Sequence, residues 1–246
     1  MSNAYAVIAG VGPGTGRSIA TRFAKAYPVV LLARSGESYD SVVAEINNTG
    51  GQAIGIATDA TDRSSLDAAF EKISKELFPG RYLAAAIYNV RPNGRPSLKP
   101  FLDLTLEELD SSLNGNIRGF FHFAQRVVPL LADAVKISNH PPTLIVTGAT
   151  ASTRGGARFG DIAAGKNGQR ALTQTVAREF SPVGVHVAHI IIDGAIDIPG
   201  RENIYNHGPD SKISPDAIAE SSWHLHTQPR SAFTHELDIR PYIGRF

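Results

Sequence analysis

Short apolar segments alternate along the chain with longer segments in which apolar residues recur every three or four positions. The short segments are rich in Val, Ile, Leu and Ala and lack strict polar alternation; they span residues 5–9, 29–33, 53–57, 83–88, 144–147 and 185–192. Such runs are typical of strands that are covered on both faces. The segments between them are predicted helices, at residues 14–26, 39–48, 63–77, 106–128, 162–180 and 215–225.

Helix start signals support this division. Thr105 and Glu108 have the spacing of a capping box, and Ser214 before Pro215 is typical of an N-cap followed by a proline. The repeated strand–helix–strand order predicts an α/β fold: a Rossmann-type doubly wound parallel sheet with helices on both faces, with residues 1–246 as a single domain. Residues 193–214 follow a predicted strand at the ligand-binding edge of such a sheet, so we expect them to form a substrate loop.

The composition excludes several classes of protein. With no Cys in 246 residues, the chain cannot be a disulfide scaffold, hold a thiolate metal centre or use a Cys nucleophile. The formal net charge of +1 argues against a nucleic-acid partner. His224 and His226 lie two positions apart on a predicted helix and do not share a face, so a metal site is not expected.

The hydropathy of the chain bears on its expected localisation. No segment approaches the ~20 consecutive apolar residues that span a bilayer, so a membrane partner is not expected. The first residues also lack the basic start of a signal peptide. We therefore expect a cytoplasmic protein that acts on a small-molecule substrate.

Four glycines, Gly10, Gly12, Gly14 and Gly16, follow the first predicted strand and open the first predicted helix. Without a Cβ atom, a glycine turn lets the backbone approach a pyrophosphate, and the helix N-terminus adds N–H donors and a positive dipole end. In this strand–turn–helix setting the pattern predicts dinucleotide binding.

The end of the second predicted strand indicates which dinucleotide is bound. Ala33 lies 23 positions after Gly10, close to where an acidic residue would bind the ribose 2′-hydroxyl of NAD, and no acid is present there. Arg34 and Ser35 follow instead, and Arg17 lies just beyond the last glycine. A guanidinium suits a 2′-phosphate because it forms bidentate, charge-assisted hydrogen bonds. The sequence therefore predicts NADP(H) as the cofactor.

The chain resembles the short-chain dehydrogenase/reductase family over nearly its whole length. The residues that carry the resemblance are Gly10, Gly14, Gly16, Asp59, Asn89, Asn116 and Lys166. Asp59 matches the family's adenine-side acid, Asn116 its active-site Asn, and Lys166 the Lys of its Tyr-x-x-x-Lys motif. The resemblance implies a cofactor site made by Gly10, Gly14, Thr15, Gly16, Arg34, Ser35, Asp59, Ala60, Asn89 and Lys166.

The family's tyrosine is missing, because Ile162 occupies the position four residues before Lys166. In the family that tyrosine is the general acid/base, the Lys lowers its pKa and holds the ribose, and a Ser stabilises the substrate oxygen. The serine position falls on Ala149 or Thr150. The chain resembles a divergent subgroup that keeps the Lys, lacks the Tyr and has a segment like residues 147–152. An ordinary tyrosine-centred mechanism is therefore excluded.

Other side chains are candidates to replace the missing phenol, namely Thr150, Ser152, Tyr88, Asp193 and Tyr205. Tyr88 ends a strand at the carboxyl edge of the sheet and can point at the nicotinamide, although a packed aromatic is an equally good interpretation. Asp193 is equally a turn residue before Gly194. The residues expected to act in catalysis are Lys166, Asn116, Thr150 and Tyr88.

Two functions remain open. The first is NADPH-dependent reduction of a small organic carbonyl, enone or imine without the usual Tyr general acid, whose loss typically slows a reaction by about 10²–10⁴-fold. The second is a cofactor-binding protein without hydride chemistry, either a non-redox enzyme or a regulatory NADP(H) binder. The intact glycine turn favours the first. By analogy with the family, whose subunits associate through the helices that carry Asn116 and Lys166, a homodimer or homotetramer is expected.

Overall fold

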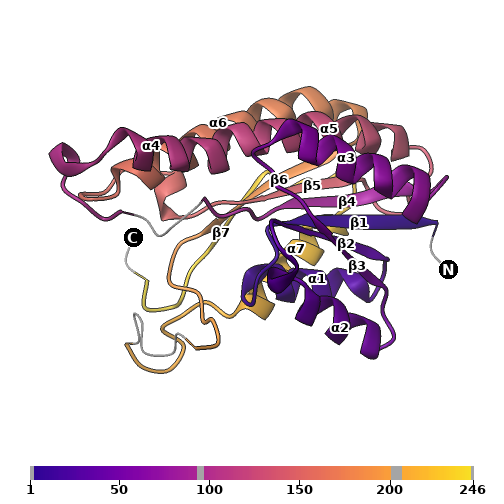
Figure 1. The fold of residues 1–246 in the computed structure, drawn as a ribbon, viewed down its shortest axis with the longest axis horizontal. Helices are drawn as coiled ribbons and strands as arrows, with labels where there is room; N and C mark the ends of the chain where they lie inside the picture. The colour runs from indigo at the N-terminus through magenta and orange to yellow at the C-terminus, as the bar shows by residue number, and fades with distance from the viewer. Residues whose placement is uncertain (1–2, 93–96, 201–206, 245–246) are drawn as a thin grey trace.

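The structure is a computed structural model that describes residues 3–92, 97–200 and 207–244. Among these residues, seven parallel strands form one sheet in the order β3-β2-β1-β4-β5-β6-β7, as Figure 1 shows. The strands are β1 (Ala4–Ala9), β2 (Val29–Ala33), β3 (Ala53–Ala57), β4 (Tyr82–Tyr88), β5 (Thr143–Thr147), β6 (His186–Ile192) and β7 (Glu236–Ile239). The predicted doubly wound parallel sheet is confirmed.

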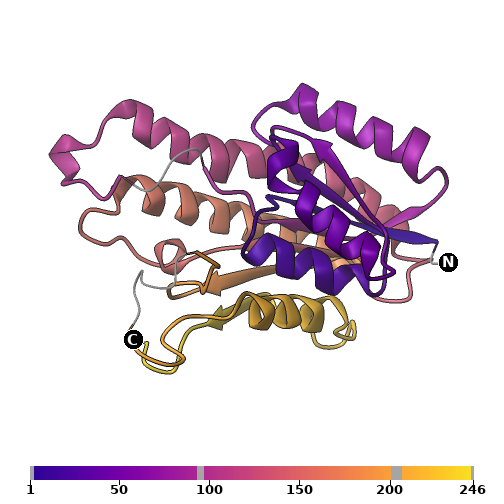
Figure 2. The same cartoon turned by 60° about the horizontal axis from the view of Figure 1, so that its bottom comes forward.

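Helices cover both faces of the sheet (Figures 1 and 2). One layer contains α1 (Thr15–Ala24), α2 (Asp40–Asn48) and α7 (Pro215–His226). The other contains α3 (Arg63–Lys72), α4 (Leu106–Leu113), α5 (Gly119–Ala134) and α6 (Gly160–Phe180). Figure 2 shows α7 beside α1, although the two helices are far apart in the sequence. The chain order reverses between β1 and β4, which is the switch point where such sheets bind ligands.

The helix predicted at residues 106–128 differs from the one observed. The capping box of Thr105 and Glu108 starts α4 as predicted, with the Thr105 side chain accepting the Glu108 amide N–H. A π-helical turn, Asn114–Arg118, then separates α4 from α5. Such turns widen a helix locally and are frequent at functional sites. This one carries Asn116, and an apolar repeat does not reveal it because the amphipathic pattern continues through the turn.

The two sides of the sheet each hold a hydrophobic core, because neighbouring side chains of a strand point to opposite faces. In β1, Ile8 packs into the core shared with α1, α2 and α7, where Phe23 is fully buried. Val7 packs into the core shared with α3 and α5, where Phe123 is fully buried. Burial on both faces accounts for the uninterrupted apolar runs of the sequence.

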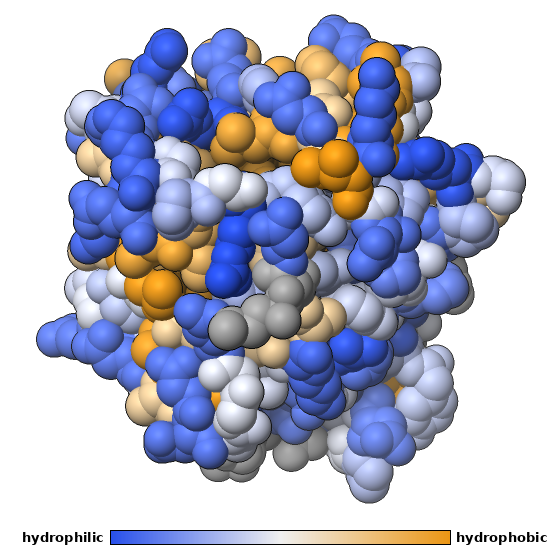
Figure 3. Space-filling model, turned by 90° about the vertical axis from the view of Figure 1, so that its right-hand side faces the viewer, coloured by the Kyte–Doolittle hydropathy of each residue, from blue (hydrophilic) through white to orange (hydrophobic). Residues whose placement is uncertain are grey.

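The carboxyl ends of the strands lie at the left of Figure 1 and their amino ends at the right. Figure 3 views the amino-end side, where hydrophobic patches are separated by hydrophilic residues. None of the helices described here combines the length and apolar character needed to cross a membrane.

Candidate active site

A cavity of about 990 Å³ lies at the carboxyl ends of the parallel strands. Its walls come from the turn after β1, the ends of β2, β4 and β5, and the facing ends of α4 and α6. Gly194, Ile196 and Ile198 of the predicted substrate loop complete the lining. Ile196 pairs with Ile213, so the two arms of the loop are joined beside the cavity. Residues 201–206 of this loop, including the candidate donor Tyr205, lie outside the described residues.

The turn after β1 is closely packed at two glycines. Gly10 has φ +90°, and a Cβ atom there would lie 2.3 Å from the Asn89 carbonyl oxygen. A Cβ atom on Gly16 would lie 2.6 Å from the Gly10 carbonyl oxygen. The Asn89 amide donates to that same oxygen at 2.8 Å, and the Thr147 hydroxyl donates to Asn89 at 3.0 Å. These contacts bring the start of α1 against the ends of β1, β4 and β5, which forms a cradle for a pyrophosphate.

The end of β2 contributes Arg34 and Ser38 to the cavity wall. Arg34 is exposed and lies on the same cavity as the glycine turn, as the sequence predicts. Ser35 does not line the cavity; Ser38 does, because the short helix Gly36–Ser38 turns the chain back toward it. The alternative cation Arg17 is directed elsewhere, since its guanidinium binds both oxygens of Glu45 at 2.6 and 2.7 Å.

Asp59 and Ala60 line the neighbouring part of the cavity, after β3. The Asp59 carboxylate accepts hydrogen bonds from the amide and the hydroxyl of Thr61, at 2.8 and 2.7 Å. Its position is therefore held by the local turn. Arg34, Asp59 and Ala60, which the sequence predicts to share one ligand, thus lie around one end of one cavity.

Lys166 lies at the other end of the cavity, on α6. Its ammonium donates to the Thr147 carbonyl oxygen at 2.8 Å and to the Gln169 side chain at 2.9 Å. Burial lowers the pKa of Lys166 to about 8. Ile162 lines the cavity one helical turn before Lys166, and Ala149 lines it at the end of β5. Neither of these two side chains carries a proton donor.

Thr150 and Asp193 are paired with each other and do not line the cavity. The Thr150 hydroxyl donates to the Asp193 carboxylate, whose other oxygen lies 3.1 Å from the Arg240 guanidinium. Of the two residues at the serine position, Ala149 lines the cavity and Thr150 does not. The Thr150 hydroxyl, which the sequence predicts to act on a substrate, is bound to Asp193 here and does not line the cavity.

Tyr88 does not face the cavity either. Its ring is fully buried between Phe120 and Phe123, and its hydroxyl donates to the Gly115 carbonyl oxygen at 2.6 Å. Burial raises the pKa of the Tyr88 phenol well above its usual range. The interpretation of Tyr88 as a replacement acid is therefore corrected: it is a packed aromatic that holds the π-helical turn against β4.

Two further candidates are buried behind the cavity wall. The Ser152 hydroxyl accepts the amide N–H of Ala149 at 3.0 Å and so shapes the turn after β5. The Asn116 amide donates to the backbone and hydroxyl oxygens of Ser112, at 3.1 and 3.2 Å. Its own oxygen is buried and has no hydrogen-bond partner among the described residues. Asn116 therefore keeps one open acceptor, and its neighbour Gly115 lines the cavity.

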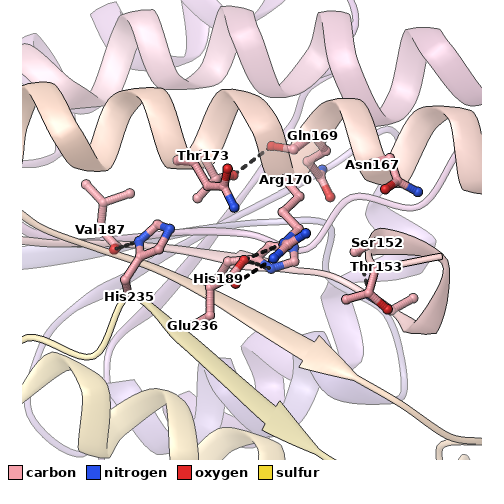
Figure 4. Close-up of polar contacts among 12 residues, drawn as sticks. Ser152, Thr153, Asn167, Gln169, Arg170, Thr173, Val187, His189, His235 and Glu236 are labelled. Atoms are coloured by element: carbon pink, nitrogen blue, oxygen red, sulfur yellow. Dashed lines mark hydrogen bonds and ion pairs between the residues drawn. The ribbon is translucent and has the colours of Figure 1, made fainter.

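A cluster of polar side chains from α6, β6 and β7 lies next to the turn after β5, on the side away from the cavity (Figure 4). Arg170 of α6 binds both oxygens of Glu236 of β7, at 2.6 and 2.8 Å. The buried ring of His189 lies beside this pair, with Nδ1 3.6 Å from the Glu236 carboxylate. Burial lowers the pKa of His189 to about 4. A Cβ atom on Gly148 would lie 2.3 Å from the His189 ring, so only glycine fits between this ring and the cavity.

Asp161 is a cavity residue that the sequence analysis missed. It immediately precedes Ile162 and is 5% exposed. One carboxylate oxygen accepts the Ser97 amide N–H at 3.2 Å, and the other has no hydrogen-bond partner among the residues described. The available signal was an acidic residue in the first turn of α6, next to the position where the tyrosine is missing.

The chain is similar over nearly its whole length to known proteins of one family. Residues 4–206 match the model of the short chain dehydrogenase family. An uncharacterized oxidoreductase of Staphylococcus aureus is 25% identical over 245 residues, which cover 98% of each chain. The crystal structure of a short-chain dehydrogenase from Rhodopseudomonas palustris superposes with a TM-score of 0.81 at 31% identity, covering 98% of this chain and 100% of that one.

A metagenomic short-chain oxidoreductase solved in complex with NADP has the same fold. It superposes with a TM-score of 0.79 at 22% identity, and the match covers 98% of both chains.

Proposed function

Because the chain belongs to the short-chain dehydrogenase family of oxidoreductases, we propose that it is an NADPH-dependent reductase of a small organic carbonyl, enone or imine. It would work without the tyrosine general acid, as a member of a divergent subgroup that keeps the active-site Lys. The residues present fit the cofactor, since the glycine cradle at Gly10 and Gly16 leaves space that any Cβ atom there would fill.

One observation carries the choice of NADPH: Arg34 lies on the cavity wall at the end of β2, where an acid would bind the ribose of NAD. A guanidinium there pairs with a 2′-phosphate through charge-assisted hydrogen bonds. The fold neighbour solved with NADP is consistent with this choice.

The chain's own residues have separate roles in this proposal. The glycine turn and the start of α1 hold the pyrophosphate, Asp59 and Ala60 flank the adenine, and Lys166 holds the nicotinamide ribose. When bound, the reduced nicotinamide supplies a hydride. Asn89, fixed by its bonds to Gly10 and Thr147, shapes the cavity beside the nicotinamide end.

The missing phenol restricts the chemistry. Ile162 and Ala149 line the cavity and cannot donate a proton to a developing alkoxide. Carbonyl reduction then loses acid catalysis, a factor of about 10²–10⁴. Substrates whose reduction places less charge on oxygen depend less on acid catalysis, so their reduction is slowed less. This favours conjugated and imine electrophiles over simple ketones.

The same two side chains favour a second candidate, a cofactor-binding protein without hydride chemistry. Both positions that would stabilise a substrate oxygen are apolar here, although the cofactor end is intact. In that case the cavity would bind NADP(H) for a non-redox or regulatory purpose.

We also propose that copies of the chain associate. Four large apolar side chains are exposed near the starts of α4 and α6, namely Phe101, Leu102, Leu106 and Phe159. Contiguous exposed apolar patches mark protein–protein contact surfaces in other proteins. Light scattering should give a dimer or tetramer mass that falls to the monomer mass in Leu102→Asp.

The test of the proposed function is a titration of the purified protein with NADPH and with NADH. Arg34→Ala should weaken NADPH binding about tenfold or more and leave NADH binding unchanged. Arg17→Ala is the matched control, because its guanidinium is bound to Glu45, and it should bind NADPH like the wild type. Equal weakening in both variants would contradict the role given to Arg34.

Isotope transfer separates the two functions. Deuterium passed from labelled NADPH to a product supports the reductase. Substrate conversion without transfer supports the non-redox alternative, and no binding of either nucleotide would refute both.

A further inference from the structure

Asp161 lines the cavity and has one buried carboxylate oxygen without a hydrogen-bond partner in the described part of the chain. The residue is 5% exposed, yet it lines the same cavity as Ile162 and Lys166. One oxygen accepts the Ser97 amide N–H at 3.2 Å, and the other has no partner within the described part of the chain. A buried carboxylate oxygen without a partner is unfavourable, so its presence beside a cavity points to a ligand that supplies the missing donor.

The surroundings of the Asp161 side chain include groups that attract a hydrogen-bond acceptor. Asp161 is the second residue of α6, and the positive end of a helix dipole stabilises an anion in the first turn. The N–H of Ser97 further stabilises a carboxylate. Asp161 is therefore suited to accept a hydrogen bond from a cation.

The wall beside Asp161 is acidic as well. Glu107, Glu108 and Asp110 of α4 line the cavity together with it. Glu108 is neutralised in part by Lys99 at 2.6 Å. Arg91 also lines the cavity, and Lys166 lies one helical turn beyond Ile162, so cations are present at the borders of this wall.

From these contacts we propose that Asp161 binds a cationic nitrogen of the substrate, and that the substrate class is a small iminium ion. This inference rests on the proposed reductase function and narrows it. The free carboxylate oxygen of Asp161 accepts the N–H of the iminium group. Its neighbour Ile162 contributes apolar surface for the carbon part of the substrate.

An iminium substrate also removes the need for the missing tyrosine. The hydride from NADPH forms a bond to the iminium carbon, and the carbon–nitrogen π electrons move to nitrogen. Nitrogen loses its positive charge and becomes an amine, while NADPH becomes NADP⁺. No proton is transferred in this step, because the nitrogen was already protonated. A ketone would instead leave an alkoxide, and neither Ile162 nor Ala149 can protonate it.

The experiment compares a cation with a neutral molecule of the same shape. Calorimetry measures binding of 2-methylpyrrolidine, the amine product of a cyclic iminium ion, and of 2-methylcyclopentanone, with and without NADP⁺. The wild type should bind the amine about tenfold or more tightly than the ketone. Asp161→Asn, which is nearly isosteric, should remove most of this preference and leave NADPH binding unchanged.

Asp103→Asn is the matched control, since Asp103 is exposed and does not line the cavity. It should keep the amine preference within about twofold of the wild type, whereas a general effect of negative charge would lower it as much as Asp161→Asn does. Urea unfolding checks that both variants fold, and the wild-type comparison of amine and ketone needs no variant.

The outcomes separate this inference from the proposed function. Normal NADPH binding without preference for the amine overturns the iminium assignment alone. If the wild type does not bind NADPH, the proposed reductase function is refuted. The titrations without cofactor then still measure whether Asp161 binds the amine. Faster reduction of 2-methylcyclopentanone than of 2-methyl-1-pyrroline would likewise refute the assignment.

Discussion

Replacing Gly16 by alanine tests the close approach of α1 to the turn after β1. The new Cβ atom would lie 2.6 Å from the Gly10 carbonyl oxygen and 2.8 Å from Val11 Cα. Ordinary contacts between heavy atoms are about 3.5 Å, so the start of α1 must move back by roughly 0.9 Å. Both obstacles are backbone atoms, which cannot rotate away as a side chain can.

The magnitude follows from three contributions. Overpacking of this kind typically costs about 1–3 kcal/mol. The bond from the Asn89 amide to Gly10 crosses the same space, 3.3 Å from the new Cβ atom, and its loss costs about 0.5–1.5 kcal/mol. Alanine returns up to about 1 kcal/mol through its higher helix propensity. We expect Gly16→Ala to lower the free energy of unfolding by about 1–3 kcal/mol.

Gly12→Ala is the matched control, because a Cβ atom on Gly12 meets nothing within 4 Å and its φ is not positive. This variant should remain within about 0.5 kcal/mol of the wild type. Urea unfolding followed by far-UV circular dichroism gives both values. NADPH affinity should also fall in Gly16→Ala, since the displaced helix end no longer faces the pyrophosphate. Equal stability of the two variants would refute the close approach described here.

Three further outcomes are expected. Tyr88→Phe leaves the buried Gly115 carbonyl oxygen unpaired and should cost about 1–3 kcal/mol in urea unfolding without changing NADPH affinity; a loss of turnover at unchanged stability would restore Tyr88 as a catalyst. Ile162→Tyr places a phenol one turn from Lys166 and should raise ketone reduction in a steady-state assay, whereas no gain would show that the cavity is not aligned for hydride delivery. Burial holds the pKa of His189 at about 4 in the folded chain against 6.5 unfolded, so the unfolded state binds more protons between these values. The free energy of unfolding should fall by about 2 kcal/mol more in the wild type than in His189→Gln between pH 7 and pH 4.5, and parallel curves would contradict this burial.

Under the proposed function, Asp161 and Ile162 determine which electrophile the cavity accepts, while the cradle around the glycine turn holds the cofactor.

Local chemistry was sufficient for much of the molecule. Buried parallel strands need apolar residues on both faces, so the runs ending at Ala9, Ala33 and Thr147 were predicted to within a residue at their ends. The capping box at Thr105 and the glycine turn after the first strand were also predicted from the sequence. A free backbone N–H needs an acceptor in any fold, and a tight turn leaves no room for a Cβ atom in any fold. Ile162 shows by its residue type alone that the position four residues before Lys166 carries no phenol.

Only the tertiary structure decided where the polar side chains of the site point. Tyr88 and Thr150 have suitable groups at suitable positions, yet Gly115 and Asp193 are the partners they bind. Asp161 was passed over, although one of its oxygens remains open. The reason is physical: a hydroxyl or carboxylate binds whichever partner three-dimensional packing brings within about 3 Å, and that partner can be far away in the sequence. Residue type determines what a side chain can do, and packing determines what it meets.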